Sequence, residues 1–195
     1  MSDKIIFATK NQGKMKEIKM ILGDLDYEVL SLEDAEINVD ILEDGNSFEE
    51  NAIIKAKEIA KISNCIVMAD DSGLEIDAFD KKPGIHSSRF LGEDTPYEIK
   101  NKYILDKLKE VRKEERTARF VCTVACVFPD GRLVTKTGVM EGYIGYEIAG
   151  KNGFGYDPIF YLPKYDSTLA QLSPEQKNKE SHRGKALEAI KMELL

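Results

Sequence analysis

The sequence predicts an α/β protein with a mixed β-sheet, and three observations carry this prediction. Short apolar, β-branched runs alternate with segments of helical periodicity, which is the pattern of strand–helix crossovers. Residues 118–128 are apolar on both faces, as expected of a strand in the middle of a sheet. A Pro129-Asp130-Gly131 turn follows them and predicts an antiparallel return. Crossovers and a hairpin together give a sheet with both parallel and antiparallel pairs.

Three strands and two helices are predicted in the N-terminal part of the chain. We expect strands over residues 4–9, 28–32 and 65–69 and helices over residues 14–22 and 47–63. Ser47 is a suitable N-cap for the second helix, because its side-chain oxygen can accept a hydrogen bond from a free backbone N–H. The third strand is short and should run into a turn formed by Asp70-Asp71-Ser72-Gly73.

Three helices and the hairpin are predicted in the C-terminal part. Thr95-Pro96-Tyr97-Glu98 supplies the N-cap, first-turn proline and N3 glutamate of a helix that should run to about Arg112. Residues 118–128 are the longest predicted strand, and residues 132–138 are its hairpin partner. Ser173-Pro174 opens a short helix. The last helix has one apolar face, which carries Ala186, Leu187, Ile190 and Leu194.

Composition and charge exclude several classes of protein. The 195 residues are 42% hydrophobic and 32% charged, which suits one folded domain, or two tightly joined lobes, over residues 1–195. The net charge of −7 argues against a broad basic face for nucleic acid or a membrane surface. No apolar run reaches the roughly 20 residues of a membrane span, and the N-terminus lacks the layout of a signal peptide. The three cysteines cannot all pair and indicate reduced thiols in a cytoplasmic protein.

The turn between the first strand and the first helix is a candidate anion site. Thr9-Lys10-Asn11-Gln12-Gly13-Lys14 lies where a helix N-terminus offers free N–H groups and the positive end of its dipole to phosphate. A Walker A loop would need glycine at the place of Ala8, so this turn is not a P-loop. The alternative is an ordinary strand–helix turn capped by Asn11.

Acidic residues in two segments are candidate metal ligands. Asp70 and Asp71 follow a strand at the end where open α/β sheets bind ligands, and their side chains should point to opposite faces. Carboxylate oxygens suit Mg²⁺, which takes one or two carboxylates plus substrate phosphates. The simpler interpretation is a solvated Asp-Ser-Gly turn. Likewise, Glu43 is simply interpreted as part of a solvated acidic loop, and Lys55 as a surface lysine on the helix after it.

Two later segments combine glycines, aromatic residues and basic side chains. Gly153-Phe154-Gly155-Tyr156-Asp157-Pro158 permits close backbone approach and offers a stacking surface for a flat base, or else it is a tight turn with core aromatics. Proline at position 158 excludes the dinucleotide-binding glycine pattern. The stretch 177–184 brings Lys177, His182 and Arg183 together on a helix or its first turn, or forms a solvated basic face.

In their order and content, these segments resemble the inosine triphosphate pyrophosphatase family, the XTP/dITP diphosphatases that clear non-standard purine nucleotides. The matching segments are Thr9-x-Asn11-x-x-Lys14, Glu43-Asp44-Gly45-x-Ser47-Phe48-x-x-Asn51-Ala52-x-x-Lys55-Ala56, Ala69-Asp70-Asp71-Ser72-Gly73-Leu74, Pro83-Gly84-Ile85-x-Ser87-x-Arg89-Phe90, Gly153-Phe154-Gly155-Tyr156-Asp157-Pro158-Ile159-Phe160 and Ser181-His182-Arg183-Gly184. They span essentially the whole chain. Ser88 stands where the family usually has alanine, and Gln171 where it usually has glutamate, which puts any role for that carboxylate in doubt.

The resemblance implies an elongated two-lobed α/β fold around a long mixed β-sheet with flanking helices, a cleft between the lobes, and usually a homodimer. It implies hydrolysis of ITP, dITP or XTP to the monophosphate and pyrophosphate, with Mg²⁺ required. Asp71 matches the catalytic acidic position and, with Glu43, is an implied metal ligand. The implied substrate-binding residues are Thr9, Lys10, Asn11, Gln12, Gly13, Lys14 and Lys55 for the triphosphate, Ser72, residues Phe154, Gly155, Tyr156 and Asp157 for the base, and Lys177, His182 and Arg183 for base or phosphate.

Several alternatives stay open at this point. Asp71 can act as the base or only as a metal ligand, because a metal-bound carboxylate has a lowered pKa, and Asp70 has no assigned role. A Maf-like pyrophosphatase for pyrimidine or modified nucleotides has the same kind of fold, but it resembles a Ser-x-Ser-Pro-Arg-Arg start that this chain lacks. A nucleotide sensor without turnover is the third hypothesis, and the intact carboxylates of Glu43, Asp70 and Asp71 argue against it.

Overall fold

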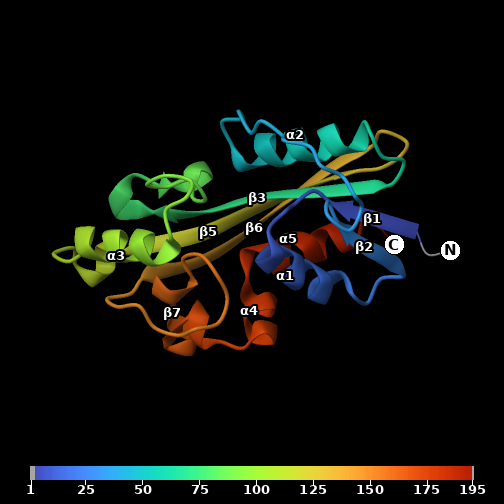
Figure 1. The fold of residues 1–195 in the computed structure, drawn as a ribbon. Coiled ribbons are helices and arrows are strands. Elements are labelled where there is room, and N and C mark those ends of the chain that lie inside the picture. The colour runs from blue at the N-terminus through green and yellow to red at the C-terminus, as the bar shows by residue number, and fades with distance from the viewer. Residues whose placement is uncertain (1–2, 195) are drawn as a thin grey trace. The chain divides into compact units, whose positions relative to one another are not determined.

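The computed structural model describes residues 3–194 as a mixed α/β fold built on one sheet (Figure 1). The sheet has eight strands in the order β2-β1-β3-β5-β6-β7-β8, with β4 paired to β3. The strands are β1 (Asp3–Phe7), β2 (Tyr27–Ser31), β3 (Ile66–Ile76), β4 (Lys82–Pro83), β5 (Thr117–Val127), β6 (Leu133–Ile144), β7 (Phe160–Leu162) and β8 (Ser167–Thr168). The α-helices are α1 (Gln12–Leu22), α2 (Phe48–Ala60), α3 (Tyr97–Lys107), α4 (Pro174–Glu180) and α5 (His182–Lys191).

Strand pairing confirms the predicted mixed sheet. β1 pairs in parallel with both β2 and β3, so that Ile5 lies opposite Val29 on one side and Ile66 on the other. β7 pairs antiparallel with β6 and with β8. β5 lies between β3 and β6 in the strand order, as its two apolar faces predicted. Within residues 3–194, no helix is long and apolar enough to cross a membrane.

The chain divides into two compact units. Unit 1 comprises residues 1–71, 122–138 and 182–195, and unit 2 comprises residues 72–121 and 139–181. Strands β3, β5 and β6 contribute residues to both units, so the division falls within strands and not in a linker. A single domain over residues 1–195 and a cleft between lobes stay predictions.

Unit 1 packs helices against both faces of its strands. In β1, the side chains of Ile5 and Phe7 join an apolar cluster with α1 and α5. The intervening Ile6 joins a different cluster with α2. Figure 1 shows the same arrangement, with α2 over one face and α1 and α5 over the other. Because side chains alternate along a strand, successive polar residues of β3 are directed toward different helices.

Unit 2 has its own core around α3 and the ends of the long strands. Ile104 and Leu108 pack with Leu74 and Ile76 of β3, and all four are fully buried. Tyr156 belongs to the same cluster, so the 153–158 segment is attached to this core.

The predicted turn at residues 70–73 is wrong, because β3 continues through it to Ile76. Alternation persists beyond the polar residues, and Leu74 and Ile76 are fully buried. Gly73 is needed for close approach of another chain segment, since a Cβ atom there would lie 2.2 Å from the carbonyl oxygen of Gly84. The polar Asp-Ser-Gly residues therefore lie within strand β3 and do not end it.

Other boundaries differ from the prediction as well, most of all at α3 and β6. α3 has Pro96 as its N-cap and ends at Lys107, well before Arg112. The Thr95 hydroxyl donates to the carbonyl of Leu91 at 2.7 Å and does not cap the helix. β6 extends to Ile144 and, with 12 residues against 11 in β5, is the longest strand. The predicted N-caps are confirmed at two helices, α2 with Ser47 and α4 with Ser173.

Candidate functional site

The β1–α1 turn is a helix start capped by Asn11, which agrees with the simpler of the two interpretations of this segment. The Asn11 side-chain oxygen accepts from the backbone N–H of Lys14 at 3.0 Å, and the Thr9 hydroxyl accepts from the N–H of Asn11 at 3.1 Å. Lys10, Asn11 and Gln12 are exposed, and Gly13 is half-buried at the first helical turn. The turn thus presents polar groups and a helix N-terminus at the C-terminal end of a parallel strand, where anions bind well.

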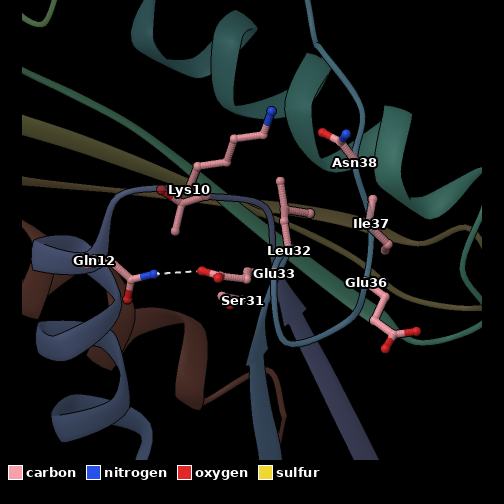
Figure 2. Close-up of a pocket in the computed structure, with 9 residues that line it drawn as sticks. Lys10, Gln12, Ser31, Leu32, Glu33, Glu36, Ile37 and Asn38 are labelled. Atoms are coloured by element: carbon pink, nitrogen blue, oxygen red, sulfur yellow. Dashed lines mark hydrogen bonds between the residues drawn. The ribbon is translucent and has the colours of Figure 1, made fainter.

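A pocket of about 440 Å³ in unit 1 adjoins this turn (Figure 2). One wall comes from Thr9, Lys10 and Gln12, and the other from residues Ser31, Leu32, Glu33, Glu36, Ile37 and Asn38. Figure 2 shows the Gln12 amide pointing at the Glu33 carboxylate, to which it donates at 3.1 Å. The pocket is lined by the predicted phosphate turn but by none of Glu43, Lys55 and Asp71.

Asp70 and Asp71 point to opposite faces of β3, as predicted for adjacent residues of a strand. On one face, Asp70 lies within 3.0 Å of the Lys14 ammonium from α1. On the other, Asp71 accepts from the Asn51 side chain of α2 at 3.2 Å. Each helix that packs on the strands of unit 1 therefore supplies a partner to one aspartate.

Asp70 is the centre of a buried ionic network. Its carboxylate accepts from Lys14 and, at 3.2 Å, from the Arg183 guanidinium, which also donates to Glu17 at 2.5 Å. Burial alone would raise the pKa of Asp70, but the Lys14 and Arg183 cations overcome it and hold that pKa well below its usual range. Burial also opposes the charge on Arg183, and Asp70 and Glu17 more than offset it, so its pKa is raised. Both shifts favour the charged forms of Asp70 and Arg183 in the folded protein.

Asp71, Glu43 and Lys55 form a second cluster with more negative than positive charge. The Lys55 ammonium lies 2.7 Å from a Glu43 oxygen and 3.5 Å from an Asp71 oxygen. Burial raises the pKa of Asp71, and the nearby Glu43 adds to this, while Lys55 and Asn51 only partly offset it. Burial would lower the pKa of Lys55, but the surrounding carboxylates raise it.

The donor set of this second cluster fits a magnesium ion that takes much of its coordination from elsewhere. No group of three histidine, cysteine or carboxylate ligands gathers within residues 3–194. Glu43 and Asp71 nevertheless converge on one cation, the ammonium of Lys55. Two hard carboxylates with a surplus negative charge suit Mg²⁺, which usually completes its shell with water and substrate phosphates. Asn51 orients the carboxylate of Asp71 from the opposite oxygen.

In unit 2, the 153–158 segment is a tight, anchored loop. Gly153 and Gly155 have φ angles of +73° and +67°, which glycine adopts without strain. The Asp157 carboxylate accepts from the Phe154 N–H at 2.8 Å and from the Lys177 ammonium at 2.6 Å. Asp157 and Lys177 are both buried, at 3% and 4% exposure. Asp157 thus closes the loop on itself and ties it to α4.

Lys177 also lies over an aromatic ring of this loop. Its ammonium is 4.6 Å from the centre of the Phe154 ring, a cation–π contact. The predicted neighbours Phe154, Asp157 and Lys177 are therefore together in unit 2. Ser72 is half-buried in β3 of the same unit, whereas His182 and Arg183 begin α5 in unit 1 and are buried. The substrate contacts predicted for these residues stay predictions.

Besides Asp70, two residues of the unit 1 clusters had no predicted role. Asn51 is 1% exposed and accepts from the Gly45 N–H at 2.9 Å while donating to Asp71, so it joins the acidic loop to the strand. Its spacing of four from Lys55 placed both on one helix face and was a usable signal. Glu17 lies three residues after Lys14 on α1. Its partner Arg183 is so distant in sequence that residue spacing could not predict the contact between them.

Comparison with known proteins places the chain among nucleotide-processing enzymes. The model of the Ham1 family matches residues 5–193. A protein named dITP/XTP pyrophosphatase from Exiguobacterium sibiricum is 46% identical over 191 residues, which cover 98% of this chain and 96% of the relative. A protein of the same name from Clostridium perfringens is 44% identical over 194 residues, covering 96% and 95%.

Solved structures agree with the fold. The Staphylococcus aureus Ham1 protein superposes with a TM-score of 0.87 at 42% identity, over 98% of both chains. A HAM1 protein from Coxiella burnetii gives a TM-score of 0.88 at 39% identity, again over 98% of both chains.

Proposed function

The chain belongs to the Ham1 family, and from that premise we propose that it is a nucleoside triphosphate pyrophosphatase acting on non-standard purine nucleotides. It hydrolyses dITP, XTP and ITP to the nucleoside monophosphate and pyrophosphate and so cleanses the nucleotide pool. Relatives that share over 40% of the sequence across nearly the whole chain carry the name dITP/XTP pyrophosphatase. The observation that carries the chemistry is the cluster of Glu43, in the loop before α2, with Lys55 of α2 and Asp71 of β3.

Local cations explain how an acidic protein holds a polyphosphate. A triphosphate carries about four negative charges near neutral pH, and the protein itself has a net charge of −7. Lys14 and Lys55 supply positive charge in unit 1, and the β1–α1 turn adds the N–H groups and dipole of a helix start. We assign Thr9 to Lys14, together with Lys55, to the triphosphate.

Mg²⁺ would be held by Glu43 and Asp71, and its charge would stabilise the developing negative charge on the phosphate oxygens. The side chains have separate tasks in the hydrolysis. Asn51 fixes one oxygen of Asp71 and so orients this carboxylate for accepting a proton. Asp71 accepts a proton from the attacking water as the water oxygen bonds to the α-phosphorus. The bond from that phosphorus to the α–β bridging oxygen breaks, and pyrophosphate leaves with the electron pair.

Unit 2 supplies the groups that hold the base. Phe154 and Tyr156 offer aromatic surface, and the glycines between and before them let a flat ligand approach the backbone. Gly155, Asp157 and Lys177 complete this set in unit 2, and Ser72, His182 and Arg183 are further proposed substrate contacts. A buried hydrogen-bond donor that faces the 6-oxo group rejects a 6-amino purine strongly, because the two donors cannot pair.

Cellular context follows from the same reasoning. We propose that the enzyme is a cytoplasmic homodimer whose cysteines are reduced. Cys122 and Cys126 are buried, Cys65 is half-buried, and all three are free thiols. Sedimentation of the purified chain tests the dimer: a mass of one chain at micromolar concentration would reject it.

A substrate panel with separate detection of pyrophosphate and orthophosphate tests the proposed function. With Mg²⁺, dITP and XTP should yield pyrophosphate faster than dATP or dGTP, and chelation by EDTA should abolish turnover. Orthophosphate as the sole product would reject the assignment. Preference for dTTP or UTP would favour the Maf-like alternative, and tight dITP binding in calorimetry without any product would favour a sensor.

A further inference from the structure

Asn101 of α3 has a hydrogen-bonding pattern that packing alone does not explain. It is 3% exposed, and its amide nitrogen donates to the Gly155 carbonyl at 3.1 Å. Because a carbonyl oxygen only accepts, the nitrogen of the amide must be the atom that faces it. The side-chain oxygen of Asn101 is buried and has no hydrogen-bond partner within residues 3–194. Burying an unpaired acceptor costs free energy, which offsets part of what the bond to Gly155 contributes to stability.

The group that Asn101 holds is the middle of the proposed base loop. Gly155 lies between Phe154 and Tyr156 and has a left-handed backbone with φ of +67°. Other contacts hold the loop at its flanks: Asp157 accepts from the Phe154 N–H, and the Tyr156 hydroxyl donates to the Ser87 carbonyl at 2.7 Å. The bond from Asn101 restrains the peptide group between the two aromatic residues.

Restraining that peptide fixes the direction of a backbone donor. The Gly155 carbonyl and the Tyr156 N–H belong to one planar trans peptide, so they point in opposite directions. With the carbonyl turned toward α3, the Tyr156 N–H is directed away from α3. Within residues 3–194, no backbone carbonyl accepts a hydrogen bond from this N–H. An N–H donor matches the 6-oxo group of hypoxanthine or xanthine and opposes the 6-amino group of adenine.

We propose that Asn101 is a positioning residue for base specificity: by holding the Gly155 carbonyl, it directs the Tyr156 N–H at the 6-oxo group of the purine. This inference rests on the proposed function, because it takes residues 154–157 to hold the base. Asn101 does not touch the substrate and acts through the loop.

The test compares Asn101→Leu with a matched control on the same helix. Ile104→Val removes one methylene group from a fully buried side chain of α3 and leaves Asn101 in place. In Asn101→Leu, kcat/KM should fall for dITP but not for dATP, so the ratio of the two falls about tenfold, the worth of one hydrogen bond. In Ile104→Val, the melting temperature should fall while the ratio stays at the wild-type value.

Folding and function are separated by two further measurements. Melting curves are recorded first, and if Asn101→Leu is unfolded at the assay temperature, the ratio is measured on Asn101→Ser, whose shorter side chain also loses the Gly155 contact. A ratio within twofold of wild type in the folded variant would overturn the inference and leave the proposed function standing. Absence of dITP hydrolysis in the wild-type enzyme would instead reject the proposed function itself.

Discussion

Replacing the adjacent aspartates with asparagine, one at a time, should lower the stability of the protein at Asp70 and leave it unchanged or higher at Asp71. Asp70→Asn removes the carboxylate that accepts from Lys14 and Arg183. Arg183 is 1% exposed and donates to Glu17, so in this variant its charge stays buried after losing one carboxylate partner. Asp71→Asn removes a charge that burial and Glu43 already disfavour.

The magnitudes follow from burial and pairing. Removing one partner of a buried ion pair costs about 3–5 kcal/mol, and the lower end applies to Asp70 because Glu17 and the half-buried Lys14 relieve part of the loss. A loss of about 3 kcal/mol corresponds to a melting temperature lower by roughly 6–12 °C for a chain of this length. The carboxyl of Asp71 has a raised pKa in the folded state, so its ionisation opposes folding above the unfolded pKa. Its neutral substitute should therefore leave the melting temperature unchanged or higher.

Thermal unfolding at pH 7 in EDTA measures both variants without any contribution from bound metal. Chemical denaturation in urea gives the corresponding free energies of unfolding. A melting temperature for Asp70→Asn within 2 °C of wild type, or a large loss in Asp71→Asn, would refute the assignment of the two faces of β3 to a structural and a functional aspartate.

Three further predictions concern activity and thiol chemistry. Asp71→Asn should lower kcat for dITP by at least about a thousandfold while the protein stays folded, and near-normal turnover would remove Asp71 from the reaction. Lys55→Met should lower kcat/KM at least about a hundredfold and make the melting temperature rise on adding Mg²⁺, because the two carboxylates lose their shared cation; an unchanged response to Mg²⁺ would count against the metal assignment. In the folded protein at pH 8, a thiolate-specific reagent should modify Cys65 alone, since burial raises the pKa of Cys122 and raises that of Cys126 from 9.0 to about 12. The neutral buried thiols favour folding below pH 9, and this contribution is lost as the pH rises toward 12; rapid labelling of all three thiols at pH 8 would contradict the burial.

Local signals predicted the start of the fold well. The β1–α1 unit follows from an apolar run, an asparagine cap and helical spacing, all of which lie within a few residues of one another. The Asn11 cap and the Ser47 cap are contacts over three residues, so the sequence pattern contains both partners. The central position of β5 also followed from its two apolar faces.

Contacts between segments that are distant in the sequence account for the errors in the predicted strand boundaries and side-chain roles. β3 continues past Asp71, and its Gly73 lies against Gly84. The Asp-Ser-Gly sequence does not indicate this contact with a later segment. The Asp70–Arg183 pair spans 113 residues and the Asn51–Asp71 pair spans 20, so spacing alone could not show which aspartate is structural. The resemblance to a family indicated candidate residues. Which side chains those residues contact, and how burial shifts their pKa values, required the structure.

Hydrolysis of dITP in water enriched in ¹⁸O tests the central claim most directly, because it reports which phosphorus the water attacks. Attack at the α-phosphorus predicts one ¹⁸O atom in the nucleoside monophosphate and none in the pyrophosphate, as read by mass spectrometry. Label in the pyrophosphate, or in released orthophosphate, would contradict the account.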